Sequence, residues 1–543
     1  LKDYYGMAAL LREFPEVRMT FNLVPSLLVQ IEAFAAGQAH DRYLEAGLRP
    51  ASDLTDADRR FMVEHFFHAN RSRLINVYPR YAELFEAAGR TGPSAPDAIQ
   101  RAARRLSVDD FRDLQVWQKL SWFDQAYLTT PGVARDLVQK GRSFTEGDKA
   151  ALRAEELQLL QAVIPEYRAA AERGQAELST SPFYHPILPL LCDTGVYART
   201  HPDAPPPRRP FAHPEEAAEQ LRKAVAYHES RFGRRPVGLW PSEGSVSDDV
   251  VRLAVEAGFE WIATDELILA RSLGVDLARD GRGVLHRPEL LYRPYRVGHT
   301  PRQIGCVFRD HALSDRIGFA YAGWPADAAA EDFVERIVEA GRACGARYGG
   351  EEPLVTVVLD GENPWEYFAY GGRPFLRALY RRLSGHPELR TVPLAEACRE
   401  ASAPLPSIFP GSWIDANFSI WIGHDDDRRA WSQLSEAYDA VTSATGVAPE
   451  ALAAAREELY VAEGSDWFWW YGDDHSSAHD REFDDLFRRH LRNVYARLNQ
   501  PVPHDLYETN ITTATAEPGT QGPSGPVTVT IDGEAGSYFE WLC

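Results

Sequence analysis

The chain begins with a helix–strand–helix pattern and continues into a long, mainly helical stretch. Residues 1–14 and 25–36 repeat their hydrophobic positions with a helical period, and the alternating run 17–22 between them predicts a short strand. Between about residues 55 and 173, amphipathic runs follow one another with few strand candidates. We therefore expect an α-β-α beginning followed by a helical insertion at about 55–173.

Strand and helix signals alternate in the middle of the chain. Residues 236–240 and 260–264 have the short β-rich pattern of strands, and a helix capped by Ser247 separates them. The continuous apolar run 354–359 is typical of a strand buried on both faces of a parallel sheet. The fold class that fits this alternation best is α/β, with a parallel core that closes as a barrel.

The pattern changes again after Glu400. Three helical runs are predicted, over residues 427–440, 449–463 and 479–498, followed by a Thr-, Gly- and Pro-rich linker and an alternating strand at 527–531.

These patterns divide the chain into three predicted domains. Residues 1–400 form the catalytic barrel with its insertion, and residues 401–510 form a C-terminal helical region that completes the site. Residues 511–543 form a linker and the start of a truncated β-sandwich.

Charge and composition narrow the function classes. The chain has 58 basic and 79 acidic residues, a net charge of −21, which argues against nucleic acid or an anionic membrane as partner. No run of 18 apolar residues predicts a membrane span, and Leu1-Lys2-Asp3 shows neither an initiator Met nor a signal peptide, so we expect a truncated start. The five isolated cysteines make a cytoplasmic localisation the expectation; they are Cys192, Cys306, Cys344, Cys398 and Cys543.

Two carboxylates follow predicted strands directly. Glu243 comes after the strand at 236–240 and Asp360 after the run 354–359. In a parallel α/β barrel the active site lies at the carboxyl ends of the strands, and two facing carboxylates suit cleavage of a glycosidic bond. Trp240 and Trp365 would then supply stacking platforms for sugar rings. The alternative is that both carboxylates are turn or capping residues at strand ends.

Two further clusters could contact a substrate. Arg309, Asp310 and His311 follow a weaker strand candidate at 303–307, and could bind sugar hydroxyls or form a solvated turn. His185 lies between prolines and could bind substrate or be structural.

Two aromatic segments, 411–424 and 463–475, combine rings with Asp, Asn and His, which a polyhydroxylated ligand needs for stacking and hydrogen bonding. A Trp-rich seam that packs the helical region on the barrel is the alternative. The candidate substrate-binding residues here are Trp413, Asp415, Asn417, Trp421, Asp466 and Trp467.

Neither a metal nor a cofactor is predicted. The histidines and aspartates near these clusters match no zinc spacing such as H-E-x-x-H, and the chain has no G-x-G-x-x-G after a strand and no Walker A motif.

Four segments together resemble glycoside hydrolase family 57. They are, in chain order, 184–189, 240–243, 308–311 and 359–363, which is the family's order, and the similarity runs from Leu1 to about Asn510. The two aromatic segments resemble the α-amylase and amylopullulanase branch. The family's first strand ends in a His-Gln-Pro motif that no residue before Val17 supplies.

The resemblance implies an incomplete (β/α)7 barrel with a C-terminal helical region, and a retaining enzyme that acts on α-glucans. By motif position, Glu243 is expected to be the nucleophile and Asp360 the general acid/base of a double displacement. Retention implies carboxyl groups about 5–5.5 Å apart, and the division of roles implies a higher pKa for Asp360.

Three alternatives remain open at this stage. A 4-α-glucanotransferase or branching enzyme would use the same pair and pass the sugar to another sugar. A metal-dependent deacetylase or mannosidase would need an Asp and two His converging on zinc. An inactive α-glucan-binding protein would have a decayed site.

Overall fold

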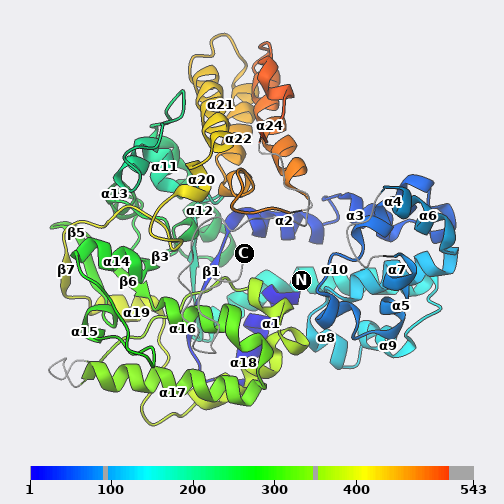
Figure 1. Cartoon of the computed structure of the whole chain (residues 1–543), viewed down its shortest axis with the longest axis horizontal. Helices are drawn as coiled ribbons and strands as arrows, with labels where there is room; N and C mark the ends of the chain where they lie inside the picture. The colour runs from blue at the N-terminus through cyan, green and yellow to red at the C-terminus, as the bar shows by residue number, and fades with distance from the viewer. Residues whose placement is uncertain (1, 90–95, 346–351, 478, 513–543) are drawn as a thin grey trace.

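The computed structural model describes residues 2–89, 96–345, 352–477 and 479–512, and its centre is a twisted sheet (Figure 1). The described residues form seven strands in the order β1-β2-β3-β4-β6-β5-β7; β5 runs antiparallel to β6, and the other neighbouring pairs are parallel. The expected parallel α/β core is confirmed. The strands are β1 (Met19–Leu23), β2 (Ala176–Thr180), β3 (Gly238–Leu239), β4 (Trp261–Asp265), β5 (Tyr295–His299), β6 (Arg302–Arg309) and β7 (Ala403–Leu405).

Helices cover this sheet and connect its strands. None of the helices in the described part of the chain is long and apolar enough to cross a bilayer. Those around the sheet are α1 (Lys2–Leu10), α2 (Pro25–Ala35), α11 (Leu188–Cys192), α12 (Pro214–Phe232), α13 (Asp248–Glu256), α14 (Glu266–Leu273), α15 (Pro288–Leu291), α16 (His311–Asp315), α17 (Ala326–Gly345), α18 (Arg373–Leu383) and α19 (Leu394–Arg399).

A separate group of helices follows α2 and lies beside the sheet, at the right of Figure 1. Three of them begin with a reciprocal capping box, at Thr55, Ser107 and Thr145, which satisfies the first backbone N–H groups and fixes where each helix starts. The group has its own hydrophobic core around Phe111 and Trp117. Its members are α3 (Arg42–Leu48), α4 (Asp56–His65), α5 (Pro79–Ala87), α6 (Pro96–Arg105), α7 (Val108–Leu120), α8 (Gln125–Thr129), α9 (Val133–Lys140) and α10 (Glu146–Glu172).

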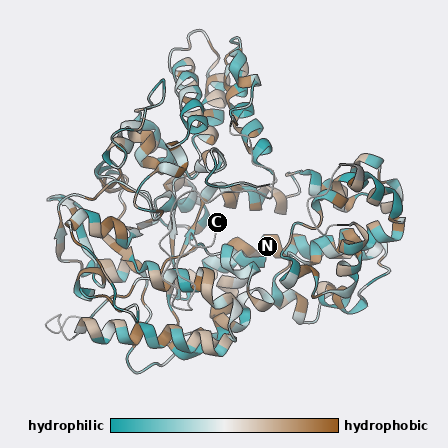
Figure 2. Cartoon of the chain, viewed as in Figure 1, coloured by the Kyte–Doolittle hydropathy of each residue, from teal (hydrophilic) through white to brown (hydrophobic). Residues whose placement is uncertain are grey.

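The C-terminal helices stand together above the sheet, and several show a hydrophilic face beside a hydrophobic one (Figures 1 and 2). Trp431 stacks on Phe468 with ring centroids 4.6 Å apart, in the same core as Leu239 and Ile262 of the sheet. The helices are α20 (Ser419–Ile422), α21 (Asp425–Thr442), α22 (Pro449–Ala462), α23 (Ser465–Phe468) and α24 (Asp480–Arg497). The strand predicted at 527–531 and nearly all of the linker lie outside the described residues.

The prediction of a strand at 354–359 is wrong. The segment forms no ladder, although Asp310 N donates to Thr356 O at 2.8 Å and Val358 N donates to the Ser314 hydroxyl at 3.2 Å. Alternate side chains still pack on opposite sides, with Val355 and Val357 against a different hydrophobic cluster from Val358. Side chains and loops thus take the place of strand partners for this segment. Across the gap that it leaves in the barrel, β1 is an edge strand that pairs, among the described residues, with β2 alone.

One long side chain holds the centre of the sheet together. The indole of Trp261 on β4 crosses over β3 and donates its N–H to Glu177 on β2 at 2.6 Å. It passes directly over Gly238, where a Cβ atom would lie 2.0 Å from the ring. Glycine is therefore required at this position of β3.

We predict that Gly238→Ala lowers the free energy of unfolding by about 1–3 kcal/mol, because the added methyl group forces the Trp261 ring aside. Gly47→Ala is the control and should not lower the free energy of unfolding, since a Cβ added to this helical glycine meets no atom within 4 Å beyond its own helix and chain neighbours. Urea unfolding of both variants measures the effect. An unchanged midpoint for Gly238→Ala would contradict the packing described.

Candidate active site

Polar side chains from successive parallel strands meet at one edge of the sheet. At or just beyond the carboxyl ends of β1, β2, β3, β4 and β6 stand Asn22, His185, Glu243, Asp265 and Arg309. A cavity of about 3900 Å³ opens here and extends down between β1 and the segment 354–360. The position is the one at which parallel α/β barrels carry their active sites.

Glu243 lies on a sharp turn directly after β3. Its backbone is in the left-handed region, with φ 55° and ψ 29°, which a non-glycine residue adopts only at a cost of about 1–3 kcal/mol. Gly244 N donates to Pro241 O at 2.8 Å and Trp413 N donates to Glu243 O at 3.0 Å, so the turn is fixed from both sides. The strained turn directs the carboxylate into the cavity, where it is a lining residue.

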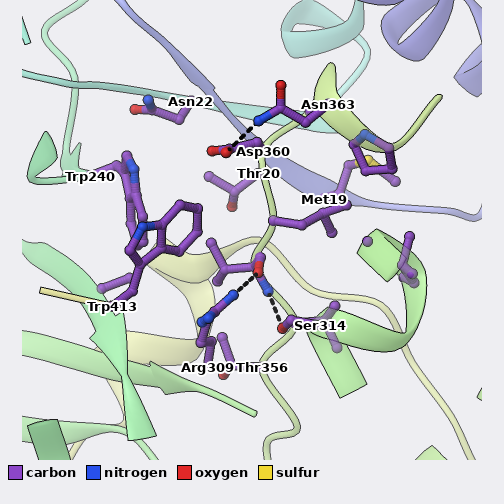
Figure 3. Close-up of a pocket in the computed structure, with 18 of the residues that line it drawn as sticks. Met19, Thr20, Asn22, Trp240, Arg309, Ser314, Thr356, Asp360, Asn363 and Trp413 are labelled. Atoms are coloured by element: carbon purple, nitrogen blue, oxygen red, sulfur yellow. Dashed lines mark hydrogen bonds between the residues drawn. The ribbon is translucent and has the colours of Figure 1, made fainter. Parts of the chain in front are cut away.

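Trp413 positions this carboxylate. Its indole N–H donates to Glu243 Oε2 at 2.8 Å, its ring packs edge to face on Trp240 at 5.1 Å, and the Arg309 guanidinium lies 4.7 Å from the ring centroid. Figure 3 shows the two indoles beside one another above Arg309. Because Arg309 and Trp240 already pack against the Trp413 ring, its placement favours a role in orienting Glu243 over a role in stacking on a sugar.

Asp360 lies across the cavity, at the end of the segment 354–359. Asn363 Nδ2 donates to Asp360 Oδ2 at 2.9 Å, and Figure 3 shows this pair opposite the two indoles. Glu362 lines the same cavity, and burial together with the charge of Asp360 raises its pKa to about 7.

The two carboxyl groups influence each other's ionisation. Burial raises the pKa of Glu243 to about 8, the charge of Asp360 adds to the rise, and the Trp413 hydrogen bond opposes it. Burial also raises the pKa of Asp360, against the Asn363 hydrogen bond and the Arg309 charge. Both shifts disfavour the state in which the two groups carry a negative charge at once. Because Arg309 and Asn363 favour ionised Asp360, a higher pKa for Asp360 stays a prediction.

A buried ion network supports the site from below. Arg309 Nε donates to Asp265 Oδ2 at 2.6 Å, and Arg309 Nη1 reaches Val358 O at 3.4 Å. His311 lies between two carboxylates, with Nδ1 3.1 Å from Asp265 Oδ2 and Nε2 2.9 Å from Asp315 Oδ2. Burial lowers the pKa of His311, but these two carboxylates outweigh it and raise the pKa to about 10.

The sequence comparison identifies the family. A profile described as glycosyl hydrolase family 57 matches residues 1–405. The chain belongs to glycosyl hydrolase family 57. The resemblance drawn from four short segments is thereby confirmed.

Individual relatives of this family 57 chain are distant. Alpha-amylase 1 of Dictyoglomus thermophilum is 29% identical over 106 residues, which span 19% of this chain and 12% of that protein. A family 57 branching enzyme from Thermococcus kodakaraensis has a TM-score of 0.57 at 14% identity, covering 91% of this chain and 84% of the other. The α-amylase AmyC from Thermotoga maritima has a TM-score of 0.53 at 14% identity, covering 92% and 87%. The shared fold confirms the predicted fold class, an incomplete (β/α)7 barrel.

Several predicted site residues of the family 57 chain do line the cavity. His185 adopts a left-handed backbone with φ 59°, and its Nδ1 lies 3.0 Å from the Ser465 hydroxyl. Trp365 lines the cavity but is buried, its indole N–H bonded to Gly361 O at 2.7 Å. The complete set of predicted residues in the lining is Glu243, Asp360, His185, Trp240, Arg309, His311, Trp365, Trp413, Asp415, Asn417 and Asp466.

Three predicted substrate-binding residues lie outside the lining. Asp310 caps α16 and accepts hydrogen bonds from Leu313 N and the Tyr292 hydroxyl, at 2.9 and 2.7 Å. Trp421 is buried in the core of the C-terminal helices, and the Trp467 indole donates to Val461 O at 2.8 Å. For these three residues the placement favours the capping and seam interpretations, because Asp310 and Trp467 bond within the protein and Trp421 is buried in the core.

Sequence reasoning missed other residues at this site. Asp265 ends β4, so the strand-end argument that selected Glu243 would also have selected it. Trp469 and Trp470 line the cavity, whereas Trp467 from the same aromatic run does not. The short helix α23 turns the later members of the run toward the cavity.

We predict that the His311 ring stays protonated from pH 5 to 9 and titrates near pH 10, because Asp265 and Asp315 hold its proton. In Asp265→Asn one of the two carboxylates is gone, so the pKa of His311 falls by at least about one unit, toward neutral pH. NMR titration of the ring C–H signal, assigned with a His311→Gln variant, measures both values. A wild-type midpoint near pH 6.5 would contradict the network.

Proposed function

We propose that this chain is a retaining glycoside hydrolase that cleaves α-glucans such as starch, glycogen and maltooligosaccharides. One observation carries the proposal: Glu243 and Asp360 project into one cavity at the carboxyl end of the sheet, close enough for the charge of one to raise the pKa of the other. Family membership supports the reaction class.

Glu243 acts as the nucleophile in the first step. A carboxylate oxygen attacks the anomeric carbon and forms a glycosyl ester, while Asp360 donates its proton to the departing glycosidic oxygen. The left-handed turn and the Trp413 indole hold the attacking carboxylate in one orientation, which lowers the entropic cost of reaching the transition state.

Asp360 changes role in the second step. As a carboxylate it takes a proton from water, whose oxygen attacks the anomeric carbon from the face that the first sugar left, and Glu243 departs. Two inversions give net retention, and the proposal requires about 5–5.5 Å between the two carboxyl groups. The charge of Arg309 assists by stabilising Asp360 once it has lost its proton.

Aromatic and amide side chains around the pair suit a polyhydroxylated chain. Trp469 and Trp470 offer rings for stacking at the rim, and Asn22, His185 and Asn417 offer hydrogen-bonding groups to sugar hydroxyls. The long cavity provides room for more than one sugar unit, which favours an oligosaccharide or a polymer as substrate.

The alternative functions are distinguished from a hydrolase either by the residues of the site or by experiment. A deacetylase needs an Asp and two His on one zinc ion, but among the described residues His185 and His311 belong to no group of converging metal ligands. A 4-α-glucanotransferase or branching enzyme would use the same pair, so the products have to distinguish it.

We predict that Glu243→Gln and Asp360→Asn each lose at least about a hundred-fold in activity on maltoheptaose, because one removes the nucleophile and the other the proton donor. Chain-length separation of the products shows shorter sugars alone for a hydrolase. Longer sugars in addition indicate a transferase. Proton NMR of fresh products shows the α anomer first if configuration is retained.

Asp473→Asn is the matched control, since this exposed carboxylate lies on the rim and contacts His424. Its activity is expected to stay within a few-fold of wild type. Binding of maltoheptaose without turnover by the wild-type protein would instead support a binding protein, and turnover that survives in both catalytic variants would overturn the assignment.

A further inference from the structure

Three histidine rings converge away from the cavity described above. His65 ends α4, His68 lies in the following turn, and His479 immediately precedes α24. One ring nitrogen of each lies within 4.8 Å of the others, and the three centroid separations are 5.2, 5.3 and 5.7 Å. The cluster therefore joins the helical group after α2 to the C-terminal helices.

We propose that His65, His68 and His479 form a site for a divalent transition-metal ion, with Zn²⁺ as the best fit. Neutral imidazole is a preferred ligand of zinc, and three histidines with one open position are a common zinc set. Tetrahedral Zn–N bonds of about 2.0–2.1 Å place the nitrogens about 3.3 Å apart. Binding therefore requires the ring nitrogens to approach one another from their present spacing of up to 4.8 Å.

The backbone presents two of the ligands as a pair. His65 and His68 form an H-x-x-H spacing in which His68 N donates to His65 O at 3.2 Å, so the turn after α4 folds the second ring back beside the first. His479 is fixed separately, because its N–H donates to the Ser477 hydroxyl at 3.0 Å and that serine in turn bonds Asp480 at 2.8 Å.

Neighbouring groups orient the rings. The Tyr43 hydroxyl lies 3.3 Å from His68 Nδ1, and if it accepts the Nδ1 proton, Nε2 keeps the lone pair that a metal needs. His65 packs against the Phe61 ring at a centroid distance of 4.5 Å. Outer contacts of this kind hold a ligand in its binding orientation before the metal arrives.

The surroundings also favour a cation. The charges of Asp41, Glu482 and Glu64 act on the Tyr43 hydroxyl beside the cluster. Glu64 Oε2 lies 3.7 Å from His65 Nε2, so a carboxylate stands beside one of the three rings. A bound Zn²⁺ would be partly neutralised by these groups.

The histidine cluster lies close in sequence to residues that line the cavity. His475 and Ser476 line the cavity, only a few residues before His479, and Trp469 and Trp470 precede them. A metal on His479 would therefore anchor the rim segment to the helical group after α2. This role is independent of the chemistry of Glu243 and Asp360.

A second group, His424 with Asp473 and Asp474, is the weaker candidate. Both of its carboxylates are exposed, and the other ring nitrogen of His424 lies 3.3 Å from Asp427. Exposed acidic pairs beside a histidine are common without any metal, so this group serves as the competitor in the test.

The test is titration of the chelator-stripped full chain with Zn²⁺ alone, in competition with a chromophoric chelator, and with Co²⁺ to read tetrahedral coordination by visible absorption. We expect one equivalent bound by wild type, with affinity at least ten-fold weaker in His68→Gln and in His479→Gln. Zn²⁺ should also raise the Tm of wild type more than that of either variant.

His504→Gln is the matched control, because His504 is a surface histidine outside the cluster. It should bind Zn²⁺ as wild type does, and circular dichroism confirms that each variant folds. Loss of binding in His424→Gln with retention in both cluster variants would overturn the proposal. Equal binding by all variants, or no binding by wild type at micromolar Zn²⁺, would overturn it as well.

Discussion

The buried ion pair of Arg309 and Asp265 is the interaction on which the site depends. Arg309 ends β6 with its side chain largely buried at the wall of the cavity, and losing one partner of such a pair costs about 3–5 kcal/mol. The same guanidinium contacts Trp413, which holds Glu243, and stabilises the charge of Asp360. One cation thus contacts the indole that holds Glu243 and favours the ionised form of Asp360.

Repulsion between the two carboxylates is the constraint that this cation balances. Both groups are buried, and the charge of Asp360 raises the pKa of Glu243, so ionisation of both groups at once is disfavoured. The Trp413 N–H provides a weaker, neutral stabilisation of Glu243. The Arg309 charge favours the ionised form of Asp360, which is the form that the second step of the proposed mechanism uses.

The sequence predicted the strand-end carboxylates because the carboxyl end of a parallel strand is a position that periodicity reveals. It could not separate Asp310 from Asp265, since both follow or end a strand and only the packing of α16 makes Asp310 a cap. The segment 354–359 has the composition of a strand, yet it pairs with no strand among the described residues. Composition does not report whether a neighbouring strand is there to pair with. His65 and His479 are far apart in sequence, so their proximity required the tertiary structure.

The most direct test of the central claim is identification of the residue that bears the sugar. A 5-fluoroglycosyl fluoride slows the second step, so the covalent intermediate accumulates and its peptides are analysed by mass spectrometry. The account predicts one fluorohexosyl unit on the peptide that carries Glu243, and none when Glu243 is Gln. A label on Asp360, or steady turnover with no labelled peptide, would contradict it.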